Sequence, residues 1–392
     1  MNSDKLKKND ANYIANTYAR FDVCIKQGKG STCEDYDGKR YIDFSSGIGV
    51  NSLGFCDESW SKAVCKQAKK LNHTSNLFYT APDVKLAKKL CTRTGYDKVF
   101  FANSGAEANE GAIKLARKKS FDKYGSNRST IISLVNSFHG RTVTTLSATG
   151  QDVFHNYFYP FTEGFVFAKA NDLDDLKQKL DDSVCGILCE LIQGEGGVIP
   201  LDKEYVQAVA KLCEEHDLTF IVDEVQTGIG RTGTLLCSEQ YGVRPNVTTL
   251  AKGLGGGLPI GAVLMDEQSS QVLGYGDHAT TFGGNPIVCA GANAVLDALT
   301  PELLEGVSQR SDYIRRVLES IDEVEAVDGI GLMLGVTLKT KKSVEVLRAC
   351  AKSGLLVLTA KHKIRLLPPL NISWMELEQG LEILKDVLCS SV

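Results

Sequence analysis

The chain has 392 residues, too many for one ordinary hydrophobic core, so we expect two or three lobes. Its apolar content of 43% and charged content of 23% are those of a globular protein, and a net charge of −4 offers no basic surface for nucleic acid. The start, residues 1–8, is polar and unlike a signal peptide, and no stretch approaches the roughly 18 apolar residues of a membrane span. We therefore expect a cytoplasmic protein that binds neither nucleic acid nor membrane.

After this polar start, residues 30–54 predict strands and turns, and amphipathic helices follow near 59–71 and 83–92. Between about 97 and 265, short apolar runs alternate with helical patterns such as 204–216. The predicted strands of this region are 98–101, 130–134, 186–188, 219–223 and 247–252. Such alternation is typical of an α/β fold with a mostly parallel, doubly wound sheet flanked by helices.

Beyond residue 286 the pattern changes to that of a smaller α+β domain. Its predicted helices are 287–299, 302–321, 342–352 and 375–388, and its predicted strands are 332–336, 355–358 and 363–367. We expect the N-terminal strands to join this domain in space. The predicted division is an N-terminal segment of the small domain (1–54), a large domain (55–285) and the C-terminal small domain (286–392).

The twelve cysteines are scattered along the chain, which is not typical of a disulfide framework. Cys185 and Cys189 are four positions apart, no Cys-x-x-Cys occurs, and none of the six histidines clusters with them. We therefore expect free thiols and no zinc site.

Asp223 and Lys252 each end one of the apolar runs of the predicted sheet. In open α/β sheets, ligands collect just outside the carboxyl ends of such strands. An acid and an amine at that edge suit pyridoxal 5′-phosphate (PLP), because its aldehyde needs a lysine for a Schiff base and its pyridinium nitrogen needs a carboxylate partner. Taken alone the pair is a weak signal, since most lysines lie on solvated surface and most strand-end aspartates cap the next turn.

A phosphate group needs a helix N-terminus with free backbone amides. Such a start follows the strand that ends at Phe101: Ser104 can cap a helix running to Arg117, and Gly105 lets the backbone approach a ligand closely. An ordinary capped helix would give the same pattern.

Residues 228–233, Gly-Ile-Gly-Arg-Thr-Gly, match the dinucleotide-binding fingerprint letter for letter. In a dinucleotide site, however, the motif directly follows a strand and opens a helix, whereas here residues 223–227 intervene and 234–237 do not resemble a helix start. A tight irregular loop is the better interpretation. A nicotinamide-dependent dehydrogenase, the alternative from another enzyme class, rests on this motif alone.

Taken together, seven stretches in order resemble the class III, fold-type I PLP-dependent aminotransferases, of the acetylornithine and ornithine branch. They cover roughly residues 30–370 and lie at 38–44, 103–108, 138–141, 192–197, 223–228, 251–253 and 280–286. Two stretches depart from the family pattern. Residues 54–58 replace the usual Gly-His-x-His-Pro, and Leu191 stands where the family has a proline after a glutamate. Neither change removes a group that the chemistry needs.

The resemblance implies roles for the cofactor site. Lys252 would bind PLP covalently and then move the proton between the substrate carbon and the cofactor, and Asp223 would keep the pyridine nitrogen protonated. Gln226 would hydrogen-bond the ring's phenolic oxygen, and Phe138 would stack on the ring. Thr281 would reach the phosphate from the neighbouring subunit of a homodimer. The rest of the phosphate site would be Ser104, Gly105 and Ala106.

For the substrates, the resemblance implies two arginines that grip carboxylates. Arg141, with Thr280 alongside, would take the carboxylate farthest from the reacting amine, and Arg365 would take the α-carboxylate of glutamate or 2-oxoglutarate. Glu195 would pair with Arg365 while an ω-amine donor occupies the site. For either arginine, a structural ion pair is the alternative.

The activity implied is transfer of the terminal amino group of N-acetylornithine to 2-oxoglutarate, through pyridoxamine phosphate, giving N-acetylglutamate 5-semialdehyde and glutamate. In an arginine-making cell the same equilibrium runs toward acetylornithine. Residues 75–79 resemble the acetylornithine branch more than the ornithine branch. The alternatives within the family are ornithine, succinylornithine, succinyldiaminopimelate and 4-aminobutyrate aminotransferases. A non-catalytic scaffold or regulator of the same fold would be expected to have lost Lys252 or Asp223, and both are present.

Overall fold

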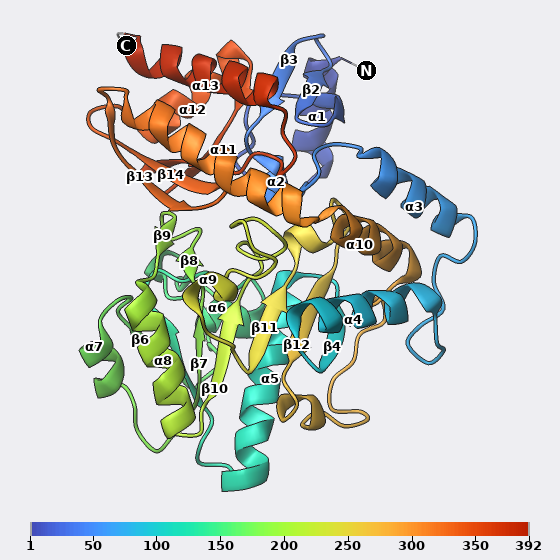
Figure 1. The fold of residues 1–392 in the computed structure, drawn as a ribbon, viewed down its shortest axis with the longest axis vertical. Coiled ribbons are helices and arrows are strands. Elements are labelled where there is room, and N and C mark those ends of the chain that lie inside the picture. Colours follow the sequence, from blue (N-terminus) through green and yellow to red (C-terminus); the bar gives the residue numbers. More distant parts are fainter. Residues whose placement is uncertain (1, 391–392) are drawn as a thin grey trace.

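A computed structural model describes residues 2–390 as a large α/β domain below a smaller domain that carries both ends of the chain (Figure 1). The large sheet has seven strands in the order β4-β12-β11-β10-β7-β5-β6. These strands are β4 (Lys98–Ala102), β5 (Thr130–Leu134), β6 (Phe165–Ala168), β7 (Val184–Cys189), β10 (Thr219–Asp223), β11 (Val247–Leu250) and β12 (Gly261–Met265). Only β12 runs against its neighbours, and the expected mostly parallel sheet is confirmed.

Helices cover the large sheet on both sides. The helices of this part of the chain are α3 (Glu58–Ala68), α4 (Ala81–Thr94), α5 (Gly105–Tyr124), α6 (Val143–Ala148), α7 (Leu173–Gln178), α8 (Lys203–Glu215) and α9 (Ser238–Tyr241), with 3₁₀ turns η1 (Asp152–Phe154), η2 (Lys252–Leu254) and η3 (Ser269–Gln271). Helix α5 packs on β11 and β12, and α8 packs on β10. The apolar side chains of α8 lie on one buried face, as its periodicity predicts.

The small domain contains two four-stranded sheets, ordered β13-β14-β17-β16 and β1-β2-β3-β15. Its strands are β1 (Ile25–Lys29), β2 (Thr32–Asp35), β3 (Arg40–Asp43), β13 (Val324–Ile330), β14 (Met333–Leu338), β15 (Leu355–Leu356), β16 (Leu358–Ala360) and β17 (Lys363–Leu366). The helices of the two chain ends are α1 (Ser3–Tyr13), α2 (Ser46–Gly49), α10 (Pro286–Ala298), α11 (Pro301–Glu319), α12 (Ser343–Ser353) and α13 (Trp374–Cys389). A two-stranded ribbon lies between the domains and consists of β8 (Ile192–Gln193) and β9 (Ile199–Pro200).

Strand β3 pairs in parallel with β15, so the N-terminal strands lie in one sheet with a C-terminal strand. Figure 1 shows these blue strands beside the red helix α13. The domain boundaries at residues 54 and 285 stay predictions.

Several elements escaped the sequence patterns. Helix α1 occupies the start that was expected only to be polar, and α5 continues to Tyr124 rather than ending at Arg117. Strands β6, β12 and β13 were not predicted. Strand β12 is a fully buried apolar run, and such a run does not reveal by its pattern which way it points in a sheet.

The cysteines of the described chain are free thiols, as expected, and residues 2–390 contain no cluster of His, Cys, Asp and Glu that could hold a metal ion. No single helix in this range is long and apolar enough to cross a membrane. Helices α10 and α11 meet the length and composition criteria only as a pair, with a bend of 72° between them.

Candidate active site

A cavity of about 510 Å³ opens beside the carboxyl end of β10 and the segment that follows β11. Nine of the twelve predicted site residues line it: Ser104, Gly105, Ala106, Phe138, Arg141, Glu195, Asp223, Gln226 and Lys252. The other three lie outside the lining, namely Thr280, Thr281 and Arg365. The sequence motifs, which are spread over about 150 residues, therefore meet in one place.

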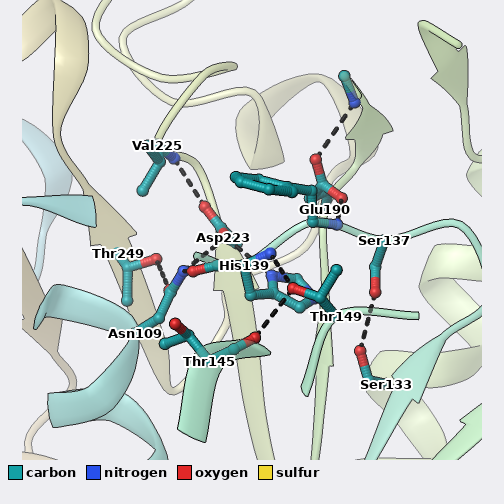
Figure 2. Close-up of polar contacts among 12 residues, drawn as sticks. Asn109, Ser133, Ser137, His139, Thr145, Thr149, Glu190, Asp223, Val225 and Thr249 are labelled. Atoms are coloured by element: carbon teal, nitrogen blue, oxygen red, sulfur yellow. Dashed lines mark hydrogen bonds and ion pairs between the residues drawn. The ribbon is translucent and has the colours of Figure 1, made fainter. Parts of the chain in front are cut away.

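Asp223 is the last residue of β10 and is 4% exposed. Its Oδ2 accepts a hydrogen bond from Asn109 Nδ2 at 2.7 Å and lies 2.8 Å from His139 Nδ1, and its Oδ1 accepts from the backbone N–H of Val225 at 3.0 Å (Figure 2). Such donors stabilise a buried negative charge. Because only one donor reaches Oδ1, this oxygen keeps an acceptor site for a ligand N–H.

Asn109 and His139 hold the Asp223 carboxylate in place, and sequence reasoning missed both. Asn109 lies on α5 and is 1% exposed. Its Oδ1 accepts a hydrogen bond from the Thr249 hydroxyl at 2.7 Å, and its Nδ2 also donates one to the His139 carbonyl at 2.8 Å. The His139 backbone N–H donates to Thr149 Oγ1 at 3.0 Å. A signal was present in the sequence, since an amide among small residues on the buried face of a helix must find a partner.

Lys252 begins η2 two residues after the end of β11, with a φ of 40° that non-glycine residues rarely adopt. A strained residue at the edge of a cavity is a common feature of functional sites. Its half-buried side chain shares the cavity with Asp223 and Glu195. Burial lowers the pKa of Lys252, while the negative charge of Glu195 acts in the opposite direction. A lowered pKa favours the neutral amine, which is the nucleophilic form.

The start of helix α5 forms the wall where a phosphate was expected. Ser104 is the N-cap, and its Oγ accepts from the backbone N–H of Glu107 at 3.1 Å. A Cβ on Gly105 would lie 2.8 Å from the Val225 side chain, so only glycine fits there without a shift. The first amides of α5 and the positive end of its dipole thus face the cavity beside Asp223.

Arg365 lies in β17 and is 3% exposed. Its Nη1 makes an ion pair with Glu195 Oε1 at 2.6 Å and contacts Gln226 Oε1 at 3.4 Å, so it meets the cavity through two lining residues. Burial pushes the pKa of Glu195 up, but the Arg365 charge and hydrogen bond outweigh it and the pKa is lowered. Glu195 is therefore ionised at neutral pH and occupies the arginine.

Phe138 and Arg141 belong to one loop on the opposite wall. The Phe138 backbone N–H donates to Glu190 Oε2 at 2.9 Å, and the Arg141 guanidinium lies 5.6 Å from the centroid of the Phe138 ring. Glu190 is a second buried carboxyl group of the cavity that the sequence did not single out, and burial raises its pKa to about 7.

Thr280 and Thr281 lie in a loop outside the cavity of their own chain. Thr280 Oγ1 accepts from Asn103 Nδ2 at 2.9 Å, while Thr281 is exposed. Thr280, predicted to bind substrate beside Arg141, thus contacts a residue of the cavity wall, Asn103, but does not itself line the cavity, and Thr281 is not brought to the other predicted cofactor ligands of this chain.

The donor set fits PLP. It combines a carboxylate with a free acceptor site on Oδ1 of Asp223, an amine of lowered pKa at Lys252, and a helix start where a side chain larger than glycine would not fit. The cavity is also of the size usual for small cofactors and substrates. The fingerprint at 228–233 forms a tight loop of turns, as expected, rather than the start of a helix, and its Arg231 side chain is fully buried.

Known proteins resemble this chain over nearly its whole length. Residues 13–388 match the family model of the class III aminotransferases. The chain is 54% identical over 390 residues to an acetylornithine aminotransferase of Haemophilus ducreyi and 47% identical over 382 residues to one of Caldanaerobacter subterraneus, covering 99% and 97% of those proteins and 99% and 96% of this chain. Its structure superposes on a crystal structure of ornithine aminotransferase from Toxoplasma gondii with a TM-score of 0.94 at 31% identity, over 99% of this chain and 95% of that one.

The chain therefore belongs to the class III aminotransferases. It is a PLP-dependent aminotransferase of fold type I, and its cofactor is pyridoxal phosphate.

Proposed function

We propose that the enzyme transfers the terminal amino group of N-acetylornithine to 2-oxoglutarate, giving N-acetylglutamate 5-semialdehyde and glutamate. The observation that carries this proposal is the Arg365–Glu195 ion pair at 2.6 Å, whose Glu195 lines the same cavity as a second arginine, Arg141. Full-length similarity to acetylornithine aminotransferases supports the choice of donor.

When bound, pyridoxal phosphate supplies an aldehyde that condenses with amines and a cationic ring that accepts the electron pair left when a substrate C–H bond breaks. Asp223 would hold the ring nitrogen, and its own partners Asn109 and His139 fix the direction of the carboxylate. Lys252 would accept the proton from the substrate carbon and return it, because its amine has a lowered pKa and shares the cavity with Asp223. The first amides of α5 and Gln226 would orient the cofactor.

The two arginines give the substrates one orientation. The carboxylate at the far end of either substrate would bind Arg141, which leaves the reacting end near Lys252. An ω-amine donor brings no carboxylate to Arg365, so Glu195 can keep its ion pair. When 2-oxoglutarate binds, its α-carboxylate would displace Glu195, which is 32% exposed and has room to leave. One cavity would thus serve both half-reactions.

We also propose a homodimer in which Thr281 completes the phosphate site of the partner. The loop of Thr280 and Thr281 is tied to Asn76, whose Nδ2 donates to the Thr280 carbonyl at 3.1 Å and to the Gly283 carbonyl at 2.8 Å. Apolar side chains stand exposed on both loops: Leu77 is 88% exposed and Phe282 is 60% exposed. Exposed apolar patches of this kind are typical of subunit interfaces. The cytoplasmic location stays a prediction.

The proposal is tested by initial rates with N-acetylornithine, ornithine, succinylornithine, succinyldiaminopimelate and 4-aminobutyrate, each against 2-oxoglutarate. N-acetylornithine should give the highest kcat/KM. Lower rates with N-acetylornithine than with ornithine would assign the enzyme to the ornithine branch instead. The dimer is tested by sedimentation and by Thr281→Ala, which should weaken PLP binding while the subunits stay associated.

A further inference from the structure

The two substrate arginines are held in different ways. Arg365 is neutralised by Glu195. Arg141, in contrast, is exposed, and within residues 2–390 its side chain has neither an ion pair nor a hydrogen bond. Its guanidinium instead lies 4.1 Å from the centroid of the Phe154 ring and 5.6 Å from that of Phe138.

An aromatic ring can fix a guanidinium without neutralising it. The ring attracts the cation through its negative face, but it takes none of the N–H donors that a carboxylate ligand needs. The Phe154 and Phe138 rings meet edge to face at 5.9 Å, so they form one aromatic support under the arginine. A carboxylate in place of Phe154 would instead occupy Arg141 and compete with substrate.

Phe154 is also tied to the loop that carries Arg141. Its backbone N–H donates to the Gln151 carbonyl at 3.0 Å, and Gln151 Nε2 donates to the Ser137 carbonyl, one residue before Phe138, at 3.0 Å. The Gly150 backbone N–H donates to Ser137 Oγ at 3.0 Å. The turn η1 and the Arg141 loop therefore form one structural unit, and Phe154 is itself half-buried.

We propose that Phe154 is a positioning and specificity residue: its ring holds the Arg141 guanidinium charged and unpaired, so that the site selects amines and oxo acids with a carboxylate at the end far from the reacting atom. This inference rests on the role proposed above for Arg141. A contact that only stabilises the loop is the competing explanation, and it predicts no selectivity between substrates.

The test uses single turnovers of the holoenzyme with donor alone, which isolates one half-reaction. Two donors are compared: N-acetylornithine and 1,4-diaminobutane, which offers the same terminal amine without a carboxylate. Phe154→Leu should raise the concentration of N-acetylornithine needed for half-maximal rate about tenfold, which corresponds to about 1.4 kcal/mol. The limiting rate and the reaction with diaminobutane should change less than about twofold. Phe154→Trp should keep the wild-type preference, and Val153→Ala, on the same turn and 68% exposed, is the matched control.

A second measurement avoids any doubt about folding. Replacing Phe154 with phenylalanines of increasing ring fluorination weakens the negative face while keeping the shape, and should raise the same half-maximal concentration stepwise. Equal losses for both donors, or no change along the fluorinated series, would overturn the role of Phe154. Arg141→Lys separates the two proposals: if it impairs N-acetylornithine while Phe154→Leu does not, only the inference on Phe154 fails. If it leaves N-acetylornithine unaffected, the proposed role of Arg141 fails as well.

Discussion

Glu195→Gln is the sharpest perturbation of the proposed reaction, because it removes the charge that competes with a substrate carboxylate for Arg365. The pair is short, at 2.6 Å, and the Arg365 side chain is only 4% exposed, so the interaction is poorly screened by water. Glutamine keeps the shape and can still accept a hydrogen bond. The change therefore replaces a charge-assisted hydrogen bond to Arg365 with a neutral one, which is weaker by about 1–2 kcal/mol. An incoming α-carboxylate then needs that much less free energy to displace residue 195 from Arg365.

We expect the KM for 2-oxoglutarate to fall by about 5- to 30-fold in this variant, with inhibition by glutamate strengthened to a similar degree. Steady-state kinetics with each substrate varied in turn would measure both effects. Glu378→Gln, which changes an exposed glutamate of α13, is the control and should be silent. An unchanged affinity for 2-oxoglutarate, in an enzyme where Arg365→Gln still abolishes that affinity, would show that Glu195 does not gate the arginine.

Three further changes test other parts of the structure. Lys252→Ala should reduce turnover by more than about 10³-fold, since it removes both the nucleophile and the proton carrier; steady-state assays that found full activity would refute the mechanism. Arg231→Met should lower the free energy of unfolding, measured in urea, by roughly 3 kcal/mol. The buried guanidinium donates hydrogen bonds to the carbonyls of Leu332 at 3.0 Å and of Pro368 at 2.5 Å, and methionine would leave both without a donor. The exposed Arg244 is the control and should tolerate the same change. Burial raises the pKa of Glu190 from 4.5 to about 7, so the folded state binds more protons than the unfolded state between these values and stability falls as pH rises through them. Glu190→Gln should therefore flatten the pH dependence of urea unfolding between pH 5 and 8 by on the order of 2–3 kcal/mol, and an unaltered slope would contradict the assignment.

The position of Asp223 and Lys252 in one cavity could be predicted because it follows from local rules. Asp223 and Lys252 end short apolar runs, and parallel strands bring their carboxyl ends to one edge of the sheet. The cap at Ser104 is likewise a local signal that spans only three residues. The same local rules gave the alternation of strands and helices from which the sheet was expected.

The supporting partners could not be predicted because they join distant parts of the chain. Asn109 is 114 residues from Asp223, and Glu195 is 170 residues from Arg365. No periodicity of the sequence encodes such pairings, which depend on strand order and on how the two domains meet. Strand β12 was not predicted at all, and its fully buried apolar run would not have told its direction in the sheet.

With the roles proposed for the two arginines, the contrast between them would explain how one cavity can distinguish two substrates of different length. A cation that is always unpaired attracts every ligand with a distal carboxylate, and so Arg141 would select in both half-reactions. A cation that is already neutralised binds only a ligand able to displace its partner, and so Arg365 would select only in the second. Had both arginines been unpaired, the product glutamate would bind more tightly and block the donor. Had both been paired, both substrates would lose affinity at Arg141, and 2-oxoglutarate would lose it at Arg365 as well. The asymmetry between the aromatic support and the carboxylate partner would therefore let one cavity of about 510 Å³ accept the donor and the acceptor in turn.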